Sequence, residues 1–392
     1  MEGPAPMSTP DLLYSDVEDD LRATVRDLVR DHCPPDSLIA RADSAEPYDL
    51  ALWRTLAADL GLAGLAVPET SGGQGASARE VALVLEELGR GLAPVPFLGS
   101  AVLATSVLSR VEAAEPGEHP AALLRRLADG SATGALAVSL AALPDAEFPT
   151  TVNAESLGDA IVLDGAVTTV ADASVADELV VPAVGPDGPG LYAVAVGAHG
   201  VTVSEAVSFD LTRRVGDVAL RRAPARVLAT GETARTALRE GRLTAAGLLA
   251  SEQLGVAQWC LDTTVAYVKQ RHQFGRPVGS FQAVKHRLAD VWLSLVGARA
   301  AARYAADVLA SPEAFESGSD VEVAVAVAQS SCAEVAVQAA EEAVQLHGGI
   351  GMTWEHPVHL YLKRAKADEL ALGTPARHRA ALATPANLPP PP

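Results

Sequence analysis

The strongest constraint on the fold is a change of hydrophobic period along the chain. From about residue 135 to residue 227, short β-prone runs alternate with Gly, Pro, Asp and Asn turns. The runs are ALAVSL, AIVLDG, ELVVPAV, GLYAVAV, GVTVSEAV and DVALRR. Because no long helical crossovers separate them, they predict an antiparallel sandwich or barrel instead of a parallel sheet. No GxGxxG motif joins a strand to a helix, so a Rossmann fold is not indicated.

Segments with the helical period lie on both sides of this region. Apolar residues recur there at three- and four-residue spacing, as on one face of an amphipathic helix. The predicted N-terminal helices cover residues 11–33, 50–65, 79–92 and 122–130. Longer Ala-rich helices without proline follow the β-prone region and predict a helical bundle. They cover residues 235–272, 281–310 and 321–347.

At 392 residues the chain exceeds the size at which one hydrophobic core stops growing, so we expect several domains. The order of the predicted elements is that of an α+β protein. The predicted units are an N-terminal helical domain at 1–134, a middle β-domain at 135–232, a C-terminal helical bundle at 233–384 and a disordered tail at 385–392.

Charge and targeting signals exclude several classes of protein. Thirty basic against 49 acidic residues give a net charge of −19, which argues against nucleic acid or an anionic membrane as a partner. The N-terminus has no signal-peptide pattern, and no charge-free run is long enough to cross a bilayer. Cys33, Cys260 and Cys332 are too far apart for a metal-binding or CxxC motif. We therefore expect a reduced, cytoplasmic protein without a metal site.

Two segments of the last third carry the chemistry. The first is YVKQRHQFGRPVGSFQAVKHRLADVW, in which Arg271, Gln273 and Phe274 stand at a helix end. A guanidinium can bind a pyrophosphate through two parallel hydrogen bonds, and an aromatic ring offers a face to a heterocycle. The second is QLHGGIGMTWEHPVHLYLKRAKADELALGT, in which Gly348 and Gly349 leave backbone N–H groups open to phosphate oxygens.

Both segments resemble the acyl-CoA dehydrogenase family, which carries an RxQFG segment, a following FQ and a Q-x-x-GG-x-G loop. GLAGLAVPETSGGQG and LEELGRGLAPVPF are similar to the family's helical N-terminal domain. The resemblance covers nearly the whole chain. It implies a helical domain, a β-domain and a C-terminal four-helix bundle, with FAD bound across a subunit interface. The residues it assigns to the cofactor, mostly to its adenosine-diphosphate half, are Arg271, Gln273, Phe274, Gln282, Gln345, Gly348, Gly349 and Thr374.

The sequence departs from the family where the general base belongs. Family members desaturate an acyl thioester with a carboxylate base, placed either before a Gly-Thr pair or on the long helix. Here those two positions hold Leu372 and Ala245, and neither side chain accepts a proton. Glu252, two helical turns after Ala245, is the first candidate for a displaced base. His347, beside the glycine loop, is predicted to be a satisfied structural histidine.

The β-domain departs from the family as well. AVSLAALPDAEF replaces the usual TEP-x-x-GSD stretch, and Thr169 and Ala171 replace a Trp-x-Thr that contacts the flavin ring. The adenosine-binding half therefore looks intact, while the flavin-ring half and the base look lost.

Three hypotheses follow from this pattern. In the first, the chain is a base-deficient subunit that completes the FAD site of a catalytic paralogue in an α₂β₂ assembly. The alternatives are a self-sufficient homo-oligomeric dehydrogenase with a displaced base, and a structural paralogue that binds neither FAD nor CoA. For the first two, the resemblance implies an acyl-CoA or other acyl thioester as substrate and an electron-transfer flavoprotein as electron acceptor.

Overall fold

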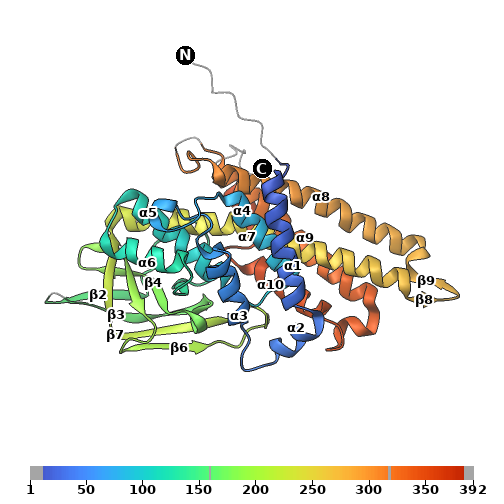
Figure 1. Cartoon of the computed structure of the whole chain (residues 1–392), viewed down its shortest axis with the longest axis horizontal. Helices are drawn as coiled ribbons and strands as arrows, with labels where there is room; N and C mark the ends of the chain where they lie inside the picture. The colour runs from blue at the N-terminus through green and yellow to red at the C-terminus, as the bar shows by residue number, and fades with distance from the viewer. Residues whose placement is uncertain (1–11, 159, 317–318, 384–392) are drawn as a thin grey trace, which may run out of the picture.

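The protein, described here by a computed structural model, folds in the predicted order of helices, sheet and helical bundle (Figure 1). The structure describes residues 12–158, 160–316 and 319–383. The tail predicted at 385–392 lies outside the described residues.

Helices of the N-terminal third pack beside the bundle and above the sheet (Figure 1). The first begins at a capping box, in which the Ser15 hydroxyl and the Glu18 carboxylate each accept a backbone N–H from the other residue. These helices are α1 (Asp16–His32), α2 (Pro35–Ala42), α3 (Leu50–Arg54), α4 (Ala78–Arg90), α5 (Thr105–Ala114) and α6 (Glu118–Ala128), with a π-helical stretch, η4 (Phe97–Ala104), before α5.

The β-domain is a seven-stranded sheet that closes on itself. Its order is β1-β4-β2-β3-β7-β5, β4 pairs with β5 to close a barrel, and β6 adds to β7. The strands are β1 (Gly134–Leu136), β2 (Val152–Leu157), β3 (Ala160–Ala171), β4 (Glu178–Gly185), β5 (Gly188–Ala195), β6 (Val201–Glu205) and β7 (Val215–Thr230). The barrel confirms the predicted class, but β4 pairs in parallel with both β1 and β2, so the sheet is not purely antiparallel. Long connections separate each parallel pair, which allows this pairing without a helical crossover.

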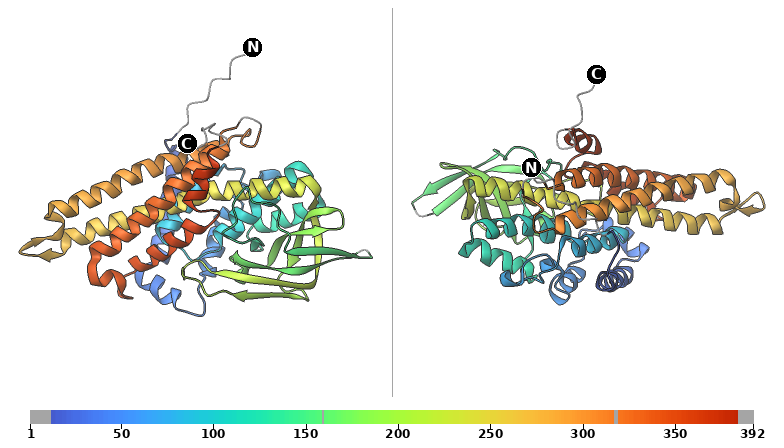
Figure 2. Two further views of the ribbon diagram at one scale, coloured as in Figure 1. Left: turned by 180° about the vertical axis from the view of Figure 1, so that it is seen from behind. Right: turned by 90° about the horizontal axis from the view of Figure 1, so that it is seen from above.

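The C-terminal helices form the bundle, and α7 spans the length of the molecule (Figures 1 and 2). They are α7 (Gly231–Gln270), α8 (Gln282–Ala310), α9 (Val321–His347), α10 (Val358–Leu370) and α11 (Pro375–Ala381). One end of α7 meets the β-domain, and the other carries a short hairpin, β8 (His272–Gln273) and β9 (Arg276–Pro277), at the free tip of the bundle.

Two helical stretches among the described residues have the length and hydropathy of a membrane span, Phe97–Ala114 and Val321–Met352. In each stretch, the 18-residue segment that meets this criterion is mostly buried inside the fold, to 61% and 67% respectively. Helices in the core of a folded domain can have the same length and hydropathy, and burial of this extent is typical of such core helices.

Candidate functional site

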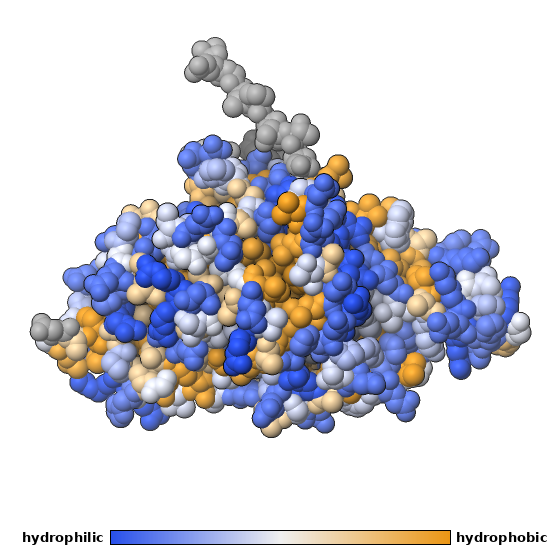
Figure 3. Space-filling view, viewed as in Figure 1, coloured by the Kyte–Doolittle hydropathy of each residue, from blue (hydrophilic) through white to orange (hydrophobic). Residues whose placement is uncertain are grey.

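The tip of the bundle presents a cationic and aromatic hairpin. Arg271 directly follows α7, and Phe274 takes φ 52°, the left-handed region that bulky residues rarely adopt. The Phe274 ring is 93% exposed. Behind it, the Phe281 ring centre lies 6.4 Å from that of Phe274 and 3.8 Å from the Arg276 guanidinium carbon. On the face shown in Figure 3, this end of the molecule is largely hydrophilic. The exposed Phe274 ring offers a surface for a planar group.

The glycine loop lies beside the same helix end. Gly348 takes φ 65° and turns the chain out of α9 into a 3₁₀ turn, Gly348–Met352. A Cβ atom at Gly348 or Gly349 would meet no other atom within 4 Å, so the backbone of the loop is open to a ligand. Tyr267, one turn before Arg271, stacks on His347 with ring centres 4.4 Å apart. The two predicted segments are therefore brought together.

The remaining predicted residues of this half are also accessible. Gln345 and Gln282 are exposed, and Gln282 begins α8 directly after the hairpin. Exposed guanidinium, amide and backbone N–H donors beside a free aromatic ring fit an adenosine diphosphate. Bound there, FAD would supply the hydride-accepting chemistry of the family, and this half of the site would hold its diphosphate and adenine.

The positions of the family's base are closed. Leu372 and Ala245 have no exposed surface. The backbone N–H of Leu372 donates to the Leu140 carbonyl (2.7 Å), and its carbonyl accepts from His378 Nε2 (3.0 Å). A ligand therefore cannot touch either side chain unless the chain moves.

The segment after β1, residues 137–148, makes this closure. A Cβ atom at Gly373 would collide with the Leu143 side chain, and Arg242 Nη2 donates to the Ala146 carbonyl (2.8 Å). A cavity of about 370 Å³ is bounded by this segment, α7, α9 and α11. Neither Leu372 nor Ala245 is among the residues that line it.

On the side of the β-domain where the family binds the flavin ring, the polar groups form hydrogen bonds to other residues of the same chain. Thr169, at φ 57°, has its hydroxyl 2.8 Å from that of Ser139, and its N–H donates to Asp217 (2.9 Å). Ala171 is buried. Thr374, assigned to the cofactor by resemblance, accepts from the Arg377 N–H (3.4 Å) and caps α11. It lies next to the closed segment, away from the hairpin.

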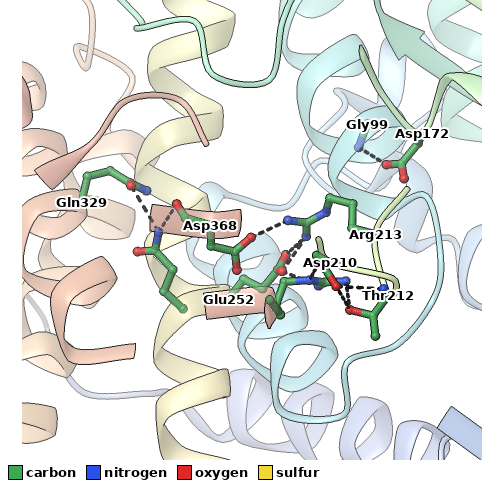
Figure 4. A network of polar contacts seen from close by, with 10 residues as sticks. Gly99, Asp172, Asp210, Thr212, Arg213, Glu252, Gln329 and Asp368 are labelled. Atoms are coloured by element: carbon green, nitrogen blue, oxygen red, sulfur yellow. Dashed lines mark hydrogen bonds and ion pairs between the residues drawn. The ribbon is translucent and has the colours of Figure 1, made fainter. Parts of the chain in front are cut away.

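Glu252 is held by two arginines in a buried ionic network (Figure 4). Glu252 is 2% exposed, and its carboxylate accepts from Arg213 Nη2 (2.5 Å) and Arg364 Nη1 (2.7 Å). Burial alone would raise the pKa of Glu252, but the two guanidinium groups hold it below its usual value. The open space beside it is about 10 Å³, too small for an acyl chain. The geometry therefore gives Glu252 a structural role.

The same network joins the segment before β7 to the C-terminal helices. Arg213 Nη1 donates to Asp368 (2.7 Å), and Arg364 Nε donates to Asp210 (2.7 Å). Burial and the neighbouring Glu252 raise the pKa of Asp368 to about 8. One further buried carboxyl, Asp172, accepts from the Gly99 N–H (2.9 Å) of the helical domain. Sequence reasoning missed the two arginines, because nothing local marks them as buried.

The two halves of the cofactor site lie far apart within one chain. Arg271 stands 26 residues beyond Ala245 along α7, roughly 40 Å at the helical rise. Figures 1 and 2 show the hairpin at the free end of the bundle and the β-domain at the opposite end. Within one chain, the hairpin therefore lies far from the β-domain and from the base positions.

These features define a flavin-dependent dehydrogenase scaffold, and the chain belongs to the acyl-CoA dehydrogenase family. Residues 15–131 match the family described as "Acyl-CoA dehydrogenase, N-terminal domain", and residues 231–385 match "Acyl-CoA dehydrogenase, C-terminal domain". FAD is the cofactor of this family.

The relatives to which the chain is similar include acyl-CoA dehydrogenases of mycobacteria. Acyl-CoA dehydrogenase IpdE2 of Mycolicibacterium smegmatis is 35% identical over 91% of this chain and 94% of the relative. Acyl-CoA dehydrogenase FadE27 of Mycobacterium tuberculosis is 34% identical, over 93% and 95%. Among solved structures, a chain of the ChsE4–ChsE5 complex from Mycobacterium tuberculosis is 30% identical, with a TM-score of 0.82 over 97% and 100% of the two chains. A chain of a variant of the Tcur3481–Tcur3483 steroid ACAD is 31% identical, with a TM-score of 0.79 over 95% and 99%.

Proposed function

We propose that this chain is the base-deficient subunit of a heteromeric acyl-CoA dehydrogenase. It lends its hairpin and glycine loop to the FAD of a catalytic paralogue, which supplies the flavin-ring surface and the base. The pair would desaturate an acyl thioester, and an electron-transfer flavoprotein would reoxidise the flavin. Similarity to chains of the two-component ChsE4–ChsE5 and Tcur3481–Tcur3483 proteins supports a heteromer.

One contrast carries the proposal. The base positions, Leu372 and Ala245, are apolar and fully buried, whereas the Phe274 ring at the other end of α7 is 93% exposed. A homo-oligomer would turn each exposed hairpin toward a β-domain whose flavin-facing groups are already bonded within the chain. In a complex with a partner whose flavin site is open, the hairpin would bind the FAD held by that partner.

The self-sufficient enzyme is less well supported. It requires a carboxylate that reaches a substrate, and Glu252 is enclosed by Arg213 and Arg364. The structural paralogue is disfavoured as well, because a scaffold that binds no nucleotide has no need for a bulky Phe274 at positive φ beside an open glycine loop.

The absorbance spectrum tests the proposal. The chain purified alone should be colourless, and co-expression with an acyl-CoA dehydrogenase paralogue should give a yellow complex with about one FAD per pair of unlike chains. Arg271→Ala should reduce the FAD content of the complex, and Arg379→Ala, on the exposed face of α11, should not. A lone chain that is yellow and is bleached by an acyl-CoA would overturn the proposal.

A further inference from the structure

His347 occupies a special place at the end of α9. It is the last residue of that helix, and Gly348 then turns the chain into the glycine loop. Its ring is 2% exposed, lies 4.4 Å from the Tyr267 ring at 25°, and lies 4.5 Å from the His356 ring at 40°. The imidazole is thus enclosed between a ring of α7 and a ring of the segment before α10.

The hydrogen bonds of His347 fix both its orientation and its protonation. Nδ1 lies 2.7 Å from the Ala343 carbonyl, which only accepts, so Nδ1 carries the proton. The Tyr267 hydroxyl donates to the His347 carbonyl (3.3 Å). Burial lowers the pKa of His347, so the ring is neutral near neutral pH. The end of α9 is therefore held through both the side chain and the main chain of this one residue.

The prediction that His347 is a satisfied histidine is met for one nitrogen only. Nε2 is buried and has no hydrogen-bond partner among the residues that the structure describes. An unpaired buried acceptor is unfavourable, and a phenylalanine would stack without this cost. Packing alone does not explain an imidazole here.

The stack continues beyond His347 into the body of the protein. The His356 ring lies 6.3 Å from Trp259, and Trp259 stacks on Tyr361 with ring centres 3.5 Å apart. The Tyr361 hydroxyl donates to the Arg90 carbonyl (2.8 Å) of the N-terminal domain. The end of α9, where the glycine loop begins, is therefore linked to the N-terminal domain through a row of ring contacts.

We infer that His347 is a positioning residue for the adenosine half of FAD. It sets the direction in which the Gly348–Met352 loop leaves α9, and so aims the loop's backbone N–H groups at the diphosphate. It does not touch the reacting atoms. The inference rests on the proposed function, because the FAD it positions is the one shared with the catalytic partner.

The test compares FAD and FMN binding to the assembled pair. His347→Phe keeps the ring stack but removes both nitrogens, and it should raise the dissociation constant of FAD roughly tenfold, about the loss of one hydrogen bond. FMN lacks the adenosine half, so its dissociation constant should not change. His119→Phe, an exposed histidine of the N-terminal domain, is the control and should change neither.

Two results would overturn the inference while leaving the proposed function intact. One is a His347→Phe pair that binds FAD as tightly as the wild type. The other is equal weakening of FAD and FMN, which is the result expected of a merely structural residue. A wild-type pair that takes up no FAD at all would overturn the proposed function itself, and this inference with it.

Discussion

Replacing Glu252 by glutamine tests whether this residue stabilises the fold or acts as a catalytic base. Glu252 lies between Arg213 and Arg364 and is 2% exposed, so the substitution removes one partner of a buried ionic network. Removing one member of such a network costs about 3–5 kcal/mol. Because glutamine has nearly the same shape and keeps one acceptor oxygen, we expect a loss of about 3 kcal/mol in the free energy of unfolding.

The loss of unfolding free energy in Glu252→Gln should depend on pH, because Glu252 helps to raise the pKa of Asp368. In the wild type the pKa of Asp368 is raised to about 8, mainly by burial and then by Glu252. A folded-state pKa above the unfolded value means that folding takes up a proton, so wild-type stability falls as pH rises from about 4 to about 8. Without Glu252 the pKa of Asp368 drops, and its ionised carboxylate balances the arginines. The effect of Glu252→Gln should therefore be smaller at about pH 9 than at about pH 6.

Equilibrium urea unfolding at the two pH values measures this difference. The matched control is Glu322→Gln, which breaks an exposed ion pair with Arg239 and should change the free energy of unfolding by less than about 1 kcal/mol. The pair with the catalytic paralogue should retain acyl-CoA oxidation in both variants. If Glu252→Gln were as stable as the wild type but abolished acyl-CoA oxidation, Glu252 would be a base and the structural reasoning would be wrong.

Three further changes test other parts of the molecule. Asp368→Asn removes the carboxyl with the raised pKa, so the fall in stability between about pH 4 and pH 8 should flatten, as measured by urea unfolding across that range. Arg271→Ala should raise the dissociation constant of FAD in the assembled pair about 10- to 100-fold, the value of a hydrogen bond to a charged group, as measured by flavin fluorescence. Leu372→Glu should not give the lone chain acyl-CoA oxidation in a dye-reduction assay, and it should lower stability, because the new carboxylate would be buried without a partner.

Much of the fold could be predicted from the sequence, and the failures have physical causes. The long helices α7, α8 and α9 lie where the proline-free, Ala-rich segments predict them. The stretch Phe97–Ala114 was not predicted as a helix, because its first half is apolar on every side and shows no periodic polar face. Strand β2 was missed because its outward residues, such as Asn153 and Glu155, give it the composition of a loop.

The candidate site also has a part that the sequence predicts and a part that it does not. The hairpin and the glycine loop could be predicted because each is a short motif formed by residues adjacent in sequence. The closure over Leu372 was not predicted, because it depends on Leu140 and Leu143, which reach Leu372 and Gly373 only in the folded chain. The ionic network was missed for the same reason, since Arg213, Glu252 and Arg364 come from different elements.

The apolar side chains at Leu372 and Ala245 and the closure over these positions are physically consistent with one another. A carboxylate at position 372 is useful only where a substrate and a flavin can reach it, and it is costly once the surroundings are dry and offer no cation. With the 137–148 segment packed over this position, leucine is the residue that the site accommodates. The hairpin begins at Arg271, roughly 40 Å from Ala245 at the helical rise of α7, so the closure does not reach it. Under the proposed function, this distance explains how a chain with closed base positions could still lend its hairpin to the FAD of a partner.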